Sequence, residues 1–340
     1  MCRKDMQNSF ELIRQPLRIG PAVLRNRIIL APMSGVTDLP FRILASEFGA
    51  GMVVTEMIAS RELVGNRAES WSRLRSAGFA PHVVQLAGRD PEIMAEAARI
   101  CEAHGADIID INMGCPAKKV IGGLSGSALL REPELALAII KAVVEAVKIP
   151  VTLKTRLGWD WDKINAPDIA AAAEALGVQM ITIHGRTRMQ FYEGRADWDR
   201  IAEVRARISV PLVANGDVDT AEDVGEILRK SGADAVMIGR ASQGRPWHLG
   251  VLAGVSTEPD AAARAAIFER QYRMMLDFYG HEGGLRHARK HIGWYLDRLP
   301  SVDQSLRQAL LVSRDTEAVV KGMRDAILAA GSGTELGIAA

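Results

Sequence analysis

The chain has few cysteines. Its 340 residues include three, Cys2, Cys101 and Cys115, and their spacing matches no zinc motif. So few thiols argue against a disulfide framework and against a zinc site. No apolar run reaches the roughly 18 to 20 residues that span a bilayer, and no apolar signal core follows the first residues. We therefore expect a cytoplasmic protein with no bound metal and no contact with a membrane.

The chain also lacks a large excess of charge of either sign. Its formal charge is +1, which neither requires nor excludes a nucleic-acid partner, because a basic face can exist on a neutral protein. A 48% hydrophobic content over this length can bury a large core, either as one α/β barrel with an appendage or as two domains. Nothing in the composition indicates a stable protein partner, and the oligomeric state is left open.

Short β-branched, apolar runs recur along the first part of the chain and alternate with helical patterns. The predicted strands are residues 28–30, 51–55, 82–86, 107–112, 151–154, 180–184, 211–215 and 234–238. The predicted helices are residues 39–48, 91–104, 133–147, 166–176, 198–208 and 220–230. Alternating strands and helices with continuously apolar strands indicate a parallel sheet covered by helices. Eight such units predict a (β/α)8 TIM barrel.

The pattern changes after Gly239-Arg240. Residues 245–247 break it, residues 256–259 resemble a linker, and residues 261 to about 330 have helical periodicity without strands. We therefore expect an α/β barrel domain at 1–245 and a smaller all-helical domain at 246–340, ending in a flexible C-terminal tail.

Active residues of a TIM barrel gather where the strands end. Directly after the predicted strands come polar or conformationally special residues: Pro32, Met33, Ser34, Glu56, Gln85, Asn112, Cys115, Lys154, His184, Asn215, Gly216, Asp217, Gly239 and Arg240. Any one of them could be a polar group at a strand end that only forms hydrogen bonds with water. Together they predict a site at this end of the barrel.

Cys115 is the strongest catalytic candidate. It lies between Gly114 and Pro116, which remove it from a regular ladder. Cys101, by contrast, belongs to a helix with apolar residues at helical spacing, so we expect it in the core. Cys2 is near the terminus and carries no prediction.

The last strand ends favour a phosphorylated ligand. Gly216 and Gly239 allow backbone N–H groups to approach an anion, and Arg240 can pair with it. Lys154 and His184 face the middle of the predicted mouth. A fixed cation there suits a reduced flavin, whose ring carries negative charge near N1 and O2, and Gln85 can bond the ring edge.

These residues carry a family resemblance. The chain resembles bacterial tRNA-dihydrouridine synthases over nearly its whole length, and most resembles the subgroup often encoded beside nitrogen-regulation genes. The motifs are Ala31-Pro-Met-Ser-Gly-Val-Thr-Asp38, Asn112-Met-Gly-Cys-Pro116, Leu153-Lys-Thr-Arg-Leu-Gly-Trp159, Ile183-His-Gly-Arg-Thr187, Asn215-Gly-Asp217 and Ile238-Gly-Arg240.

The resemblance implies an FMN enzyme that uses NADPH to saturate the C5–C6 bond of uridines in tRNA. It implies that Cys115 protonates the base and that the other predicted residues surround FMN: Pro32, Met33, Ser34, Gln85, Lys154, His184, Asn215, Gly216, Asp217, Gly239 and Arg240. The chemistry agrees with this role. Hydride reaches C6 from flavin N5, and C5 then needs a proton from a positioned acid. An ordinary thiol, with a pKa of roughly 8.5, is largely protonated at neutral pH.

The resemblance also implies that the C-terminal helices bind tRNA. Arg286, Arg289 and Lys290 lie in a basic stretch beside Trp294 and Tyr295, and Lys118 and Lys119 follow the cysteine. Cations and aromatic faces suit RNA, although such a run is also typical of a solvated helix face. The Gly122-Gly123 pair departs from the larger polar groups of other members.

Three alternatives stay open. A flavin barrel acting on a free pyrimidine, like a dihydroorotate dehydrogenase, has similar strand-end chemistry. A flavin-free lyase would use Lys154 as a Schiff-base amine. A non-catalytic RNA-binding module would keep only the fold. The residues do not identify the uridine that is reduced, and they do not separate NADPH from NADH.

Overall fold

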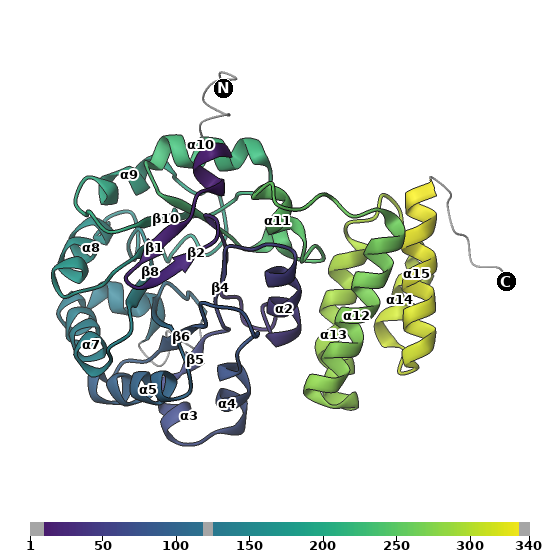
Figure 1. Ribbon diagram of the computed structural model, residues 1–340, viewed down its shortest axis with the longest axis horizontal. Coiled ribbons are helices and arrows are strands. Elements are labelled where there is room, and N and C mark those ends of the chain that lie inside the picture. Colours follow the sequence, from purple (N-terminus) through teal and green to yellow (C-terminus); the bar gives the residue numbers. More distant parts are fainter. Residues whose placement is uncertain (1–9, 118–124, 333–340) are drawn as a thin grey trace.

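The computed structural model describes residues 10–117 and 125–332. Lys118 and Lys119 lie outside these residues, and so does the C-terminal end of the chain, where a tail is predicted. Within them, parallel strands form one curled sheet whose outer face is covered by helices, which confirms the predicted barrel (Figure 1). Its strands are β3 (Ile28–Leu30), β4 (Met52–Val53), β5 (Ile58–Ala59), β6 (Val83–Ala87), β7 (Ile108–Met113), β8 (Val151–Arg156), β9 (Ile181–His184), β10 (Leu212–Asn215) and β11 (Ala235–Ile238).

The second predicted strand, residues 51–55, is present as β4, and a further short strand that was not predicted, β5, follows it. β4 pairs with β3, β5 pairs with β6, and a parallel bridge between Val54 and Val83 joins the two edges of the sheet. The break between β4 and β5 coincides with a polar contact, because Thr55 Oγ1 accepts a hydrogen bond from Gln85 N at 3.0 Å. β4 and β5 together therefore take the place of one barrel strand and close the ring.

All six predicted barrel helices are present, and their ends lie within a few residues of the prediction: α2 (Leu39–Glu47), α5 (Pro91–Ala103), α7 (Pro133–Ala146), α8 (Ala166–Ala175), α9 (Asp199–Arg205) and α10 (Ala221–Ser231). Side chains cap several of them. Asp90 accepts from two backbone N–H groups of α5, and Thr220 forms a capping box with Asp223 at α10. Two short helices, α3 (Ser60–Val64) and α4 (Ala68–Leu74), were not predicted.

An unpredicted hairpin closes the N-terminal end of the barrel. Its strands, β1 (Leu17–Ile19) and β2 (Ala22–Leu24), are antiparallel and joined by Gly20 and Pro21. Gly20 has φ of 55°, which glycine adopts without strain. Leu17, Ile19 and Leu24 join the apolar side chains inside the barrel. This hairpin leaves the opposite, C-terminal end open for a site.

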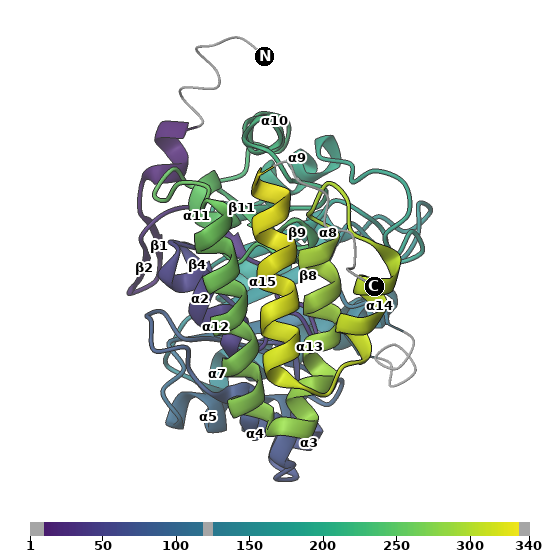
Figure 2. The ribbon, with the colours of Figure 1, turned by 90° about the vertical axis from the view of Figure 1, so that its right-hand side faces the viewer.

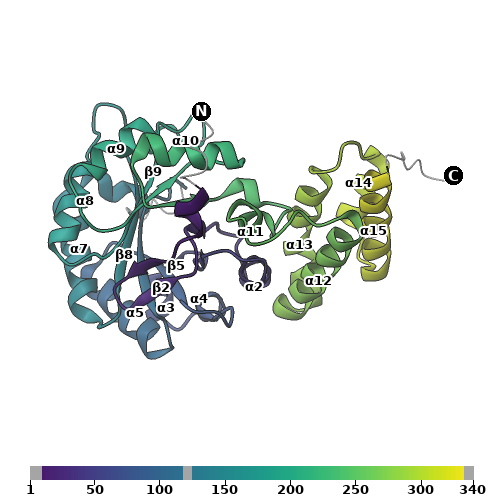
Figure 3. The same ribbon diagram turned by 45° about the horizontal axis from the view of Figure 1, so that its top comes forward.

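The C-terminal helices form a second, adjoining cluster (Figure 2). They are α12 (Ala261–Tyr279), α13 (His281–Leu296), α14 (Gln304–Val312) and α15 (Thr316–Ser332). The short helix α11 (His248–Leu252) lies between them and the barrel (Figure 3), and its Leu249 and Leu252 belong to the barrel core. The helices predicted after residue 261 are confirmed, and the division of the chain between residues 245 and 246 stays a prediction.

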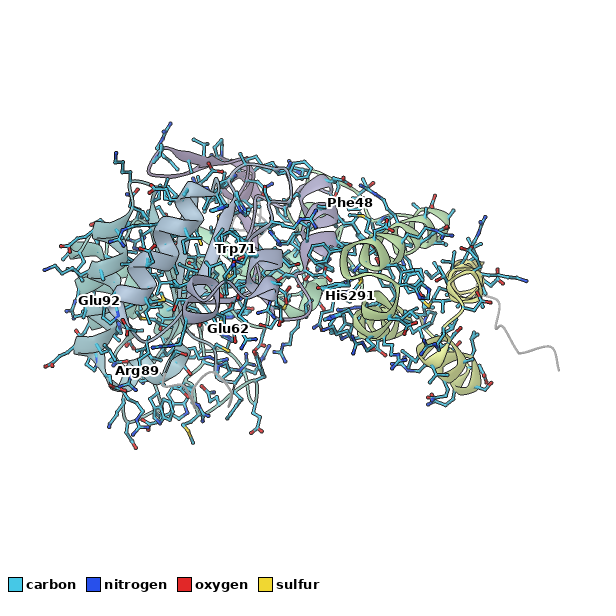
Figure 4. The ribbon with its side chains drawn as sticks, turned by 90° about the horizontal axis from the view of Figure 1, so that it is seen from below. Phe48, Glu62, Trp71, Arg89, Glu92 and His291 are labelled. Carbon is cyan, nitrogen blue, oxygen red and sulfur yellow. The ribbon has the colours of Figure 1, made fainter. Side chains whose placement is uncertain are left out.

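The two parts meet along α2, α12 and α13. Arg270 pairs with Glu47, and Tyr279 donates a hydrogen bond to Asp38 Oδ2 at 3.2 Å. Phe48 and His291 lie on the two sides of this junction (Figure 4). Membrane-spanning length and apolarity do not occur together in any helix that the structure describes.

Candidate active site

A cavity of about 1150 Å³ opens at the C-terminal ends of the barrel strands. Of the strand-end residues that the sequence predicts for the site, all but Glu56 line it: Pro32, Met33, Ser34, Gln85, Asn112, Cys115, Lys154, His184, Asn215, Gly216, Asp217, Gly239 and Arg240. Glu56 instead accepts a hydrogen bond from the backbone N–H of Gly35. Residues far apart in the sequence therefore share one space because their strands end at the same edge of the sheet.

The alternation of side chains along each strand selects which polar groups reach this space. β6, β7 and β8 pair in parallel register, with Gln85 opposite Asp110 and Asp110 opposite Thr152. Two residues further along β7 and β8, Asn112 is opposite Lys154. Because side chains two residues apart point to the same face of a strand, these groups form successive polar layers inside the barrel. The layers lie above the apolar filling of its other end.

Lys154 is the buried cation of the site. Its Nζ donates to Asn215 Oδ1 at 3.1 Å, and Asn215 Nδ2 donates to the carbonyl of Met237 at 2.8 Å. Burial, aided by the charge of Arg156, lowers the pKa of Lys154 to about 8. The amine is held in one place by an amide, without a direct carboxylate partner among the described residues.

His184 is a neutral imidazole. Burial and the charges of nearby cations, Arg156 first among them, lower its pKa well below the ordinary value. Its Nε2 lies 3.2 Å from Arg186 Nη1, which can only donate, so this nitrogen accepts and the proton resides on Nδ1. Arg186 in turn pairs with Asp217 at 2.5 Å.

The Cys115 loop is held by three side chains. Asn112 Oδ1 accepts from the backbone N–H groups of Gly114 at 3.1 Å and Cys115 at 3.0 Å. Ser127 Oγ donates to the carbonyl of Cys115 at 2.8 Å, and Arg156 Nε donates to that of Gly114 at 2.8 Å. The Cys115 side chain is partly exposed and faces the cavity. Its backbone is therefore fixed while its thiol stays accessible.

Cys101 is different in every respect. It lies in α5 with none of its surface exposed, and burial raises the pKa of its thiol to about 12. The sequence prediction that Cys101 belongs to the core is confirmed.

The end of the cavity that is predicted to bind phosphate contains paired charges. Asp217 accepts from Arg240 at 3.0 Å as well as from Arg186. Gly216 has φ of 128°, and an added Cβ would lie 2.7 Å from that of Ala196, so the protein itself requires glycine there. At Gly239 an added Cβ would have no contact closer than 3.6 Å.

The predicted RNA-binding side chains of α13 are all exposed. Arg286, Arg289 and Lys290 lie three and four residues apart, on one face of the helix. None of the three forms an ion pair with a residue in the described ranges, 10–117 and 125–332. Lys290 reaches the barrel, because a Cβ at Gly35 would lie only 2.1 Å from its Nζ. This face thus begins beside the cavity-lining loop at Met33 and Ser34.

The sequence matches one family over most of its length. The family model described as dihydrouridine synthase (Dus) covers residues 29–330. The chain belongs to the dihydrouridine synthase family. A relative in Rhizobium leguminosarum bv. phaseoli, named probable tRNA-dihydrouridine synthase, is 66% identical over 305 residues, which cover 89% of this chain and 96% of that protein. A Pseudomonas aeruginosa protein named tRNA-dihydrouridine synthase B is 46% identical over 316 residues, covering 91% and 95%.

Solved structures support the fold of this family member. An old yellow enzyme homologue from Zymomonas mobilis matches with a TM-score of 0.51 and 17% identity, over 69% of this chain and 90% of that one. Histamine dehydrogenase from Rhizobium sp. 4-9 matches with a TM-score of 0.56 and 14% identity, over 94% of this chain and 65% of that one. At such low identity the likeness concerns the barrel fold alone.

The structure adds two residues to the site of this family member. Arg156 lines the cavity, donates to two backbone carbonyls of the loop after β9 and lies 5.5 Å from the ring centre of Tyr192. Tyr192, 52% exposed, also lies beside Arg240. Arg156 follows Lys154 by two residues on β8, so strand alternation could have identified it. Nothing in the sequence pattern singles out Tyr192.

Proposed function

We propose that this enzyme reduces the C5–C6 double bond of uridines in tRNA to 5,6-dihydrouridine, with FMN as cofactor and NADPH as reductant. The observation that carries the proposal is the meeting of Cys115 with Lys154 and His184 in one cavity. An accessible thiol on a fixed loop can deliver a proton, and a buried cation can stabilise an anionic ring.

The residues present fit a phosphorylated flavin. The cavity exceeds the roughly 300 to 1000 Å³ of common ligand pockets. Its titratable lining has five cationic side chains (Arg73, Lys154, Arg156, Arg240, Arg298) and three carboxylates (Glu62, Asp217, Asp219), which favours an anionic ligand. Lys154, His184 and Gln85 would hold the ring, with Pro32, Met33 and Ser34 beside it. Asn215, Gly216, Asp217, Gly239 and Arg240 would hold the phosphate end.

The chain's own groups then have separate tasks. FMN, when bound and reduced by NADPH, would supply hydride for C6 of the uracil. The Cys115 thiol gives its proton to C5 on the other side of the reacting bond, and Asn112 keeps the loop in place through two backbone N–H groups. The Lys154 ammonium opposes negative charge in the cavity. Neutral His184 donates through Nδ1 and adds no further positive charge.

The tRNA would lie across the barrel mouth and α13. Arg286, Arg289 and Lys290 would contact phosphates, and Lys290 lies next to the cavity loop. The target uridine must leave its stack to reach the cavity, at a cost of a few kcal/mol that phosphate contacts offset.

The direct test is mass spectrometry of nucleosides from unmodified tRNA incubated with the protein, FMN and NADPH. We expect a uridine that has gained two hydrogens. If tRNA is unchanged while free orotate or uracil is converted, the enzyme acts on a free pyrimidine instead.

The role of Cys115 has its own test. Cys115→Ala is expected to lower uridine reduction by about 10²- to 10⁴-fold, because a positioned acid contributes that much. The rate of flavin reduction by NADPH, measured by the loss of the flavin's visible absorbance, should be unchanged. Cys101→Ala is the thiol control and should retain both rates. Equal uridine reduction by wild type and Cys115→Ala would exclude the proton-donor role.

A further inference from the structure

Asp110 is a buried carboxylate that the proposed mechanism does not use. It lies on β7, is 3% exposed and belongs to the polar layer just below the cavity. Its Oδ1 accepts from Thr152 Oγ1 at 2.6 Å, and its Oδ2 accepts from Gln85 Nε2 at 2.7 Å. Burial raises its pKa, while these two hydrogen bonds and the charge of Lys154 oppose the rise. Asp110 does not line the cavity.

A continuous relay of hydrogen bonds leads from Asp110 to Cys115. Gln85 Oε1 accepts from Asn112 Nδ2 at 2.8 Å. Asn112 Oδ1 then accepts from Gly114 N and Cys115 N, at 3.1 and 3.0 Å. Each side chain in the relay is at most 8% exposed, so its hydrogen bonds are largely shielded from bulk water.

The chemistry of the first member sets the direction of the whole relay. A carboxylate only accepts hydrogen bonds, so Gln85 must present its NH₂ group to Asp110. The oxygen of Gln85 then faces Asn112, which must present its own NH₂ group. The oxygen of Asn112 is left facing the two N–H groups of the Cys115 loop.

We propose that Asp110 is a positioning residue for Cys115: its carboxylate orients Gln85 and Asn112 so that the proton-donor loop is held in place. This inference rests on the proposed role of Cys115. In Asp110→Asn the side chain keeps its shape but can offer either NH₂ or oxygen to Gln85. If the side-chain amides of Gln85 and Asn112 both flip, so that their oxygen and NH₂ groups change places, Gly114 N and Cys115 N face an NH₂ group and lose their acceptor.

The experiment compares Asp110→Asn with Thr152→Val. The second variant removes the other hydrogen bond to the same carboxylate but leaves Gln85 with its partner. Asp110→Asn is expected to lower uridine reduction at saturating tRNA by about 10- to 100-fold, the effect of misplacing a reacting group by about 1 Å. Thr152→Val should stay near wild type. Equal losses in both variants, or no loss in Asp110→Asn, would overturn the proposal.

A second readout needs neither FMN nor tRNA. Alkylation of Cys115 by iodoacetamide in the flavin-free protein, followed by peptide mass spectrometry, reports how firmly the loop is held. We expect several-fold faster labelling in Asp110→Asn and in Gln85→Met, which breaks the relay one link later. Thr152→Val should label at the wild-type rate. Buried Cys101 is the internal control for folding in each variant. An unchanged Cys115 rate in both relay variants would contradict the proposal even if the enzyme proved to act on another substrate.

Discussion

The barrel mouth and helix α13 both present cations, but they hold them differently. In the mouth, Lys154 is buried and held by Asn215 at 3.1 Å, on a strand whose register fixes its position. On α13, Arg286 and Arg289 extend into solvent from one helix face. A buried, fixed charge can stabilise the charge that develops in a transition state, whereas exposed charges attract the phosphates of a polyanion at longer range. The two regions should therefore control different steps: the barrel mouth should control the reaction, and α13 should control tRNA binding.

Among the cations of the two regions, the largest expected effect comes from removing the buried one. Lys154→Met should slow reduction of the flavin by NADPH about 100-fold, because a fixed positive charge in a dry site stabilises a developing anion. Stopped-flow absorbance of the loaded enzyme measures this rate. Lys141→Met, which removes an exposed lysine paired with Glu145, is the control and should leave it unchanged.

The same substitution should stabilise the fold. The pKa of Lys154 falls from 10.5 to about 8 on folding, so between these values the unfolded chain binds the proton more tightly. Stability therefore increases as pH rises from about 8 toward 10.5, by up to about 3 kcal/mol. Lys154→Met should remove this rise and be the more stable protein at pH 7 in urea unfolding without flavin. Lower stability of Lys154→Met at pH 7 would contradict the assignment of a costly buried charge.

A smaller effect is expected from the exposed charges. Arg286→Gln/Arg289→Gln/Lys290→Gln should weaken tRNA binding by about 10-fold or more near physiological salt and reduce the slope of log K against log salt by up to about 3. Filter binding over a salt series measures both quantities. The matched control is Arg273→Gln/Arg307→Gln/Arg314→Gln, whose charges already pair with Glu317, Asp297 and Glu282. Equal weakening in the two triple variants would remove α13 as a specific RNA face.

The smallest effect concerns the junction between the two regions. Tyr279→Phe removes the hydrogen bond to Asp38 and keeps the ring that stacks on His287. We expect a loss of about 1 kcal/mol in the free energy of unfolding and no change in the rate at saturating tRNA. A large fall in that rate would show that the junction also controls the chemistry.

Much of the barrel could be predicted because its signals are local. Strands such as β8 and β10 are apolar runs bounded by turn residues, and each active group follows a strand end. That rule predicts that Lys154, His184 and Asn215 lie together, and all three line the same cavity.

Other features depend on contacts between distant segments. The break between β4 and β5 coincides with the hydrogen bond between Thr55 and Gln85, and no local sequence pattern predicts such a contact. Asp110 lies within an apolar run of the sequence, so no local pattern indicates a role for it. The positioning role proposed for it depends on its hydrogen bonds with Gln85 and Thr152, which come from the two neighbouring strands. The β1–β2 hairpin did have a signal, since Gly20-Pro21 separates two short alternating runs. In the C-terminal helices, the sequence could not tell which cations are paired, because Arg273 and Arg314 pair with Glu317 and Glu282, which lie far from them along the chain.

The most direct test of this division of labour is a single-turnover experiment. The flavin is first reduced with NADPH without oxygen, and its reoxidation is then followed after mixing with increasing tRNA. We predict that Cys115→Ala stays slow at saturating tRNA, whereas the α13 triple variant is slow only at low tRNA and recovers the wild-type rate at saturation. A Cys115→Ala enzyme rescued by more tRNA, or a triple variant that stays slow at saturation, would contradict the account.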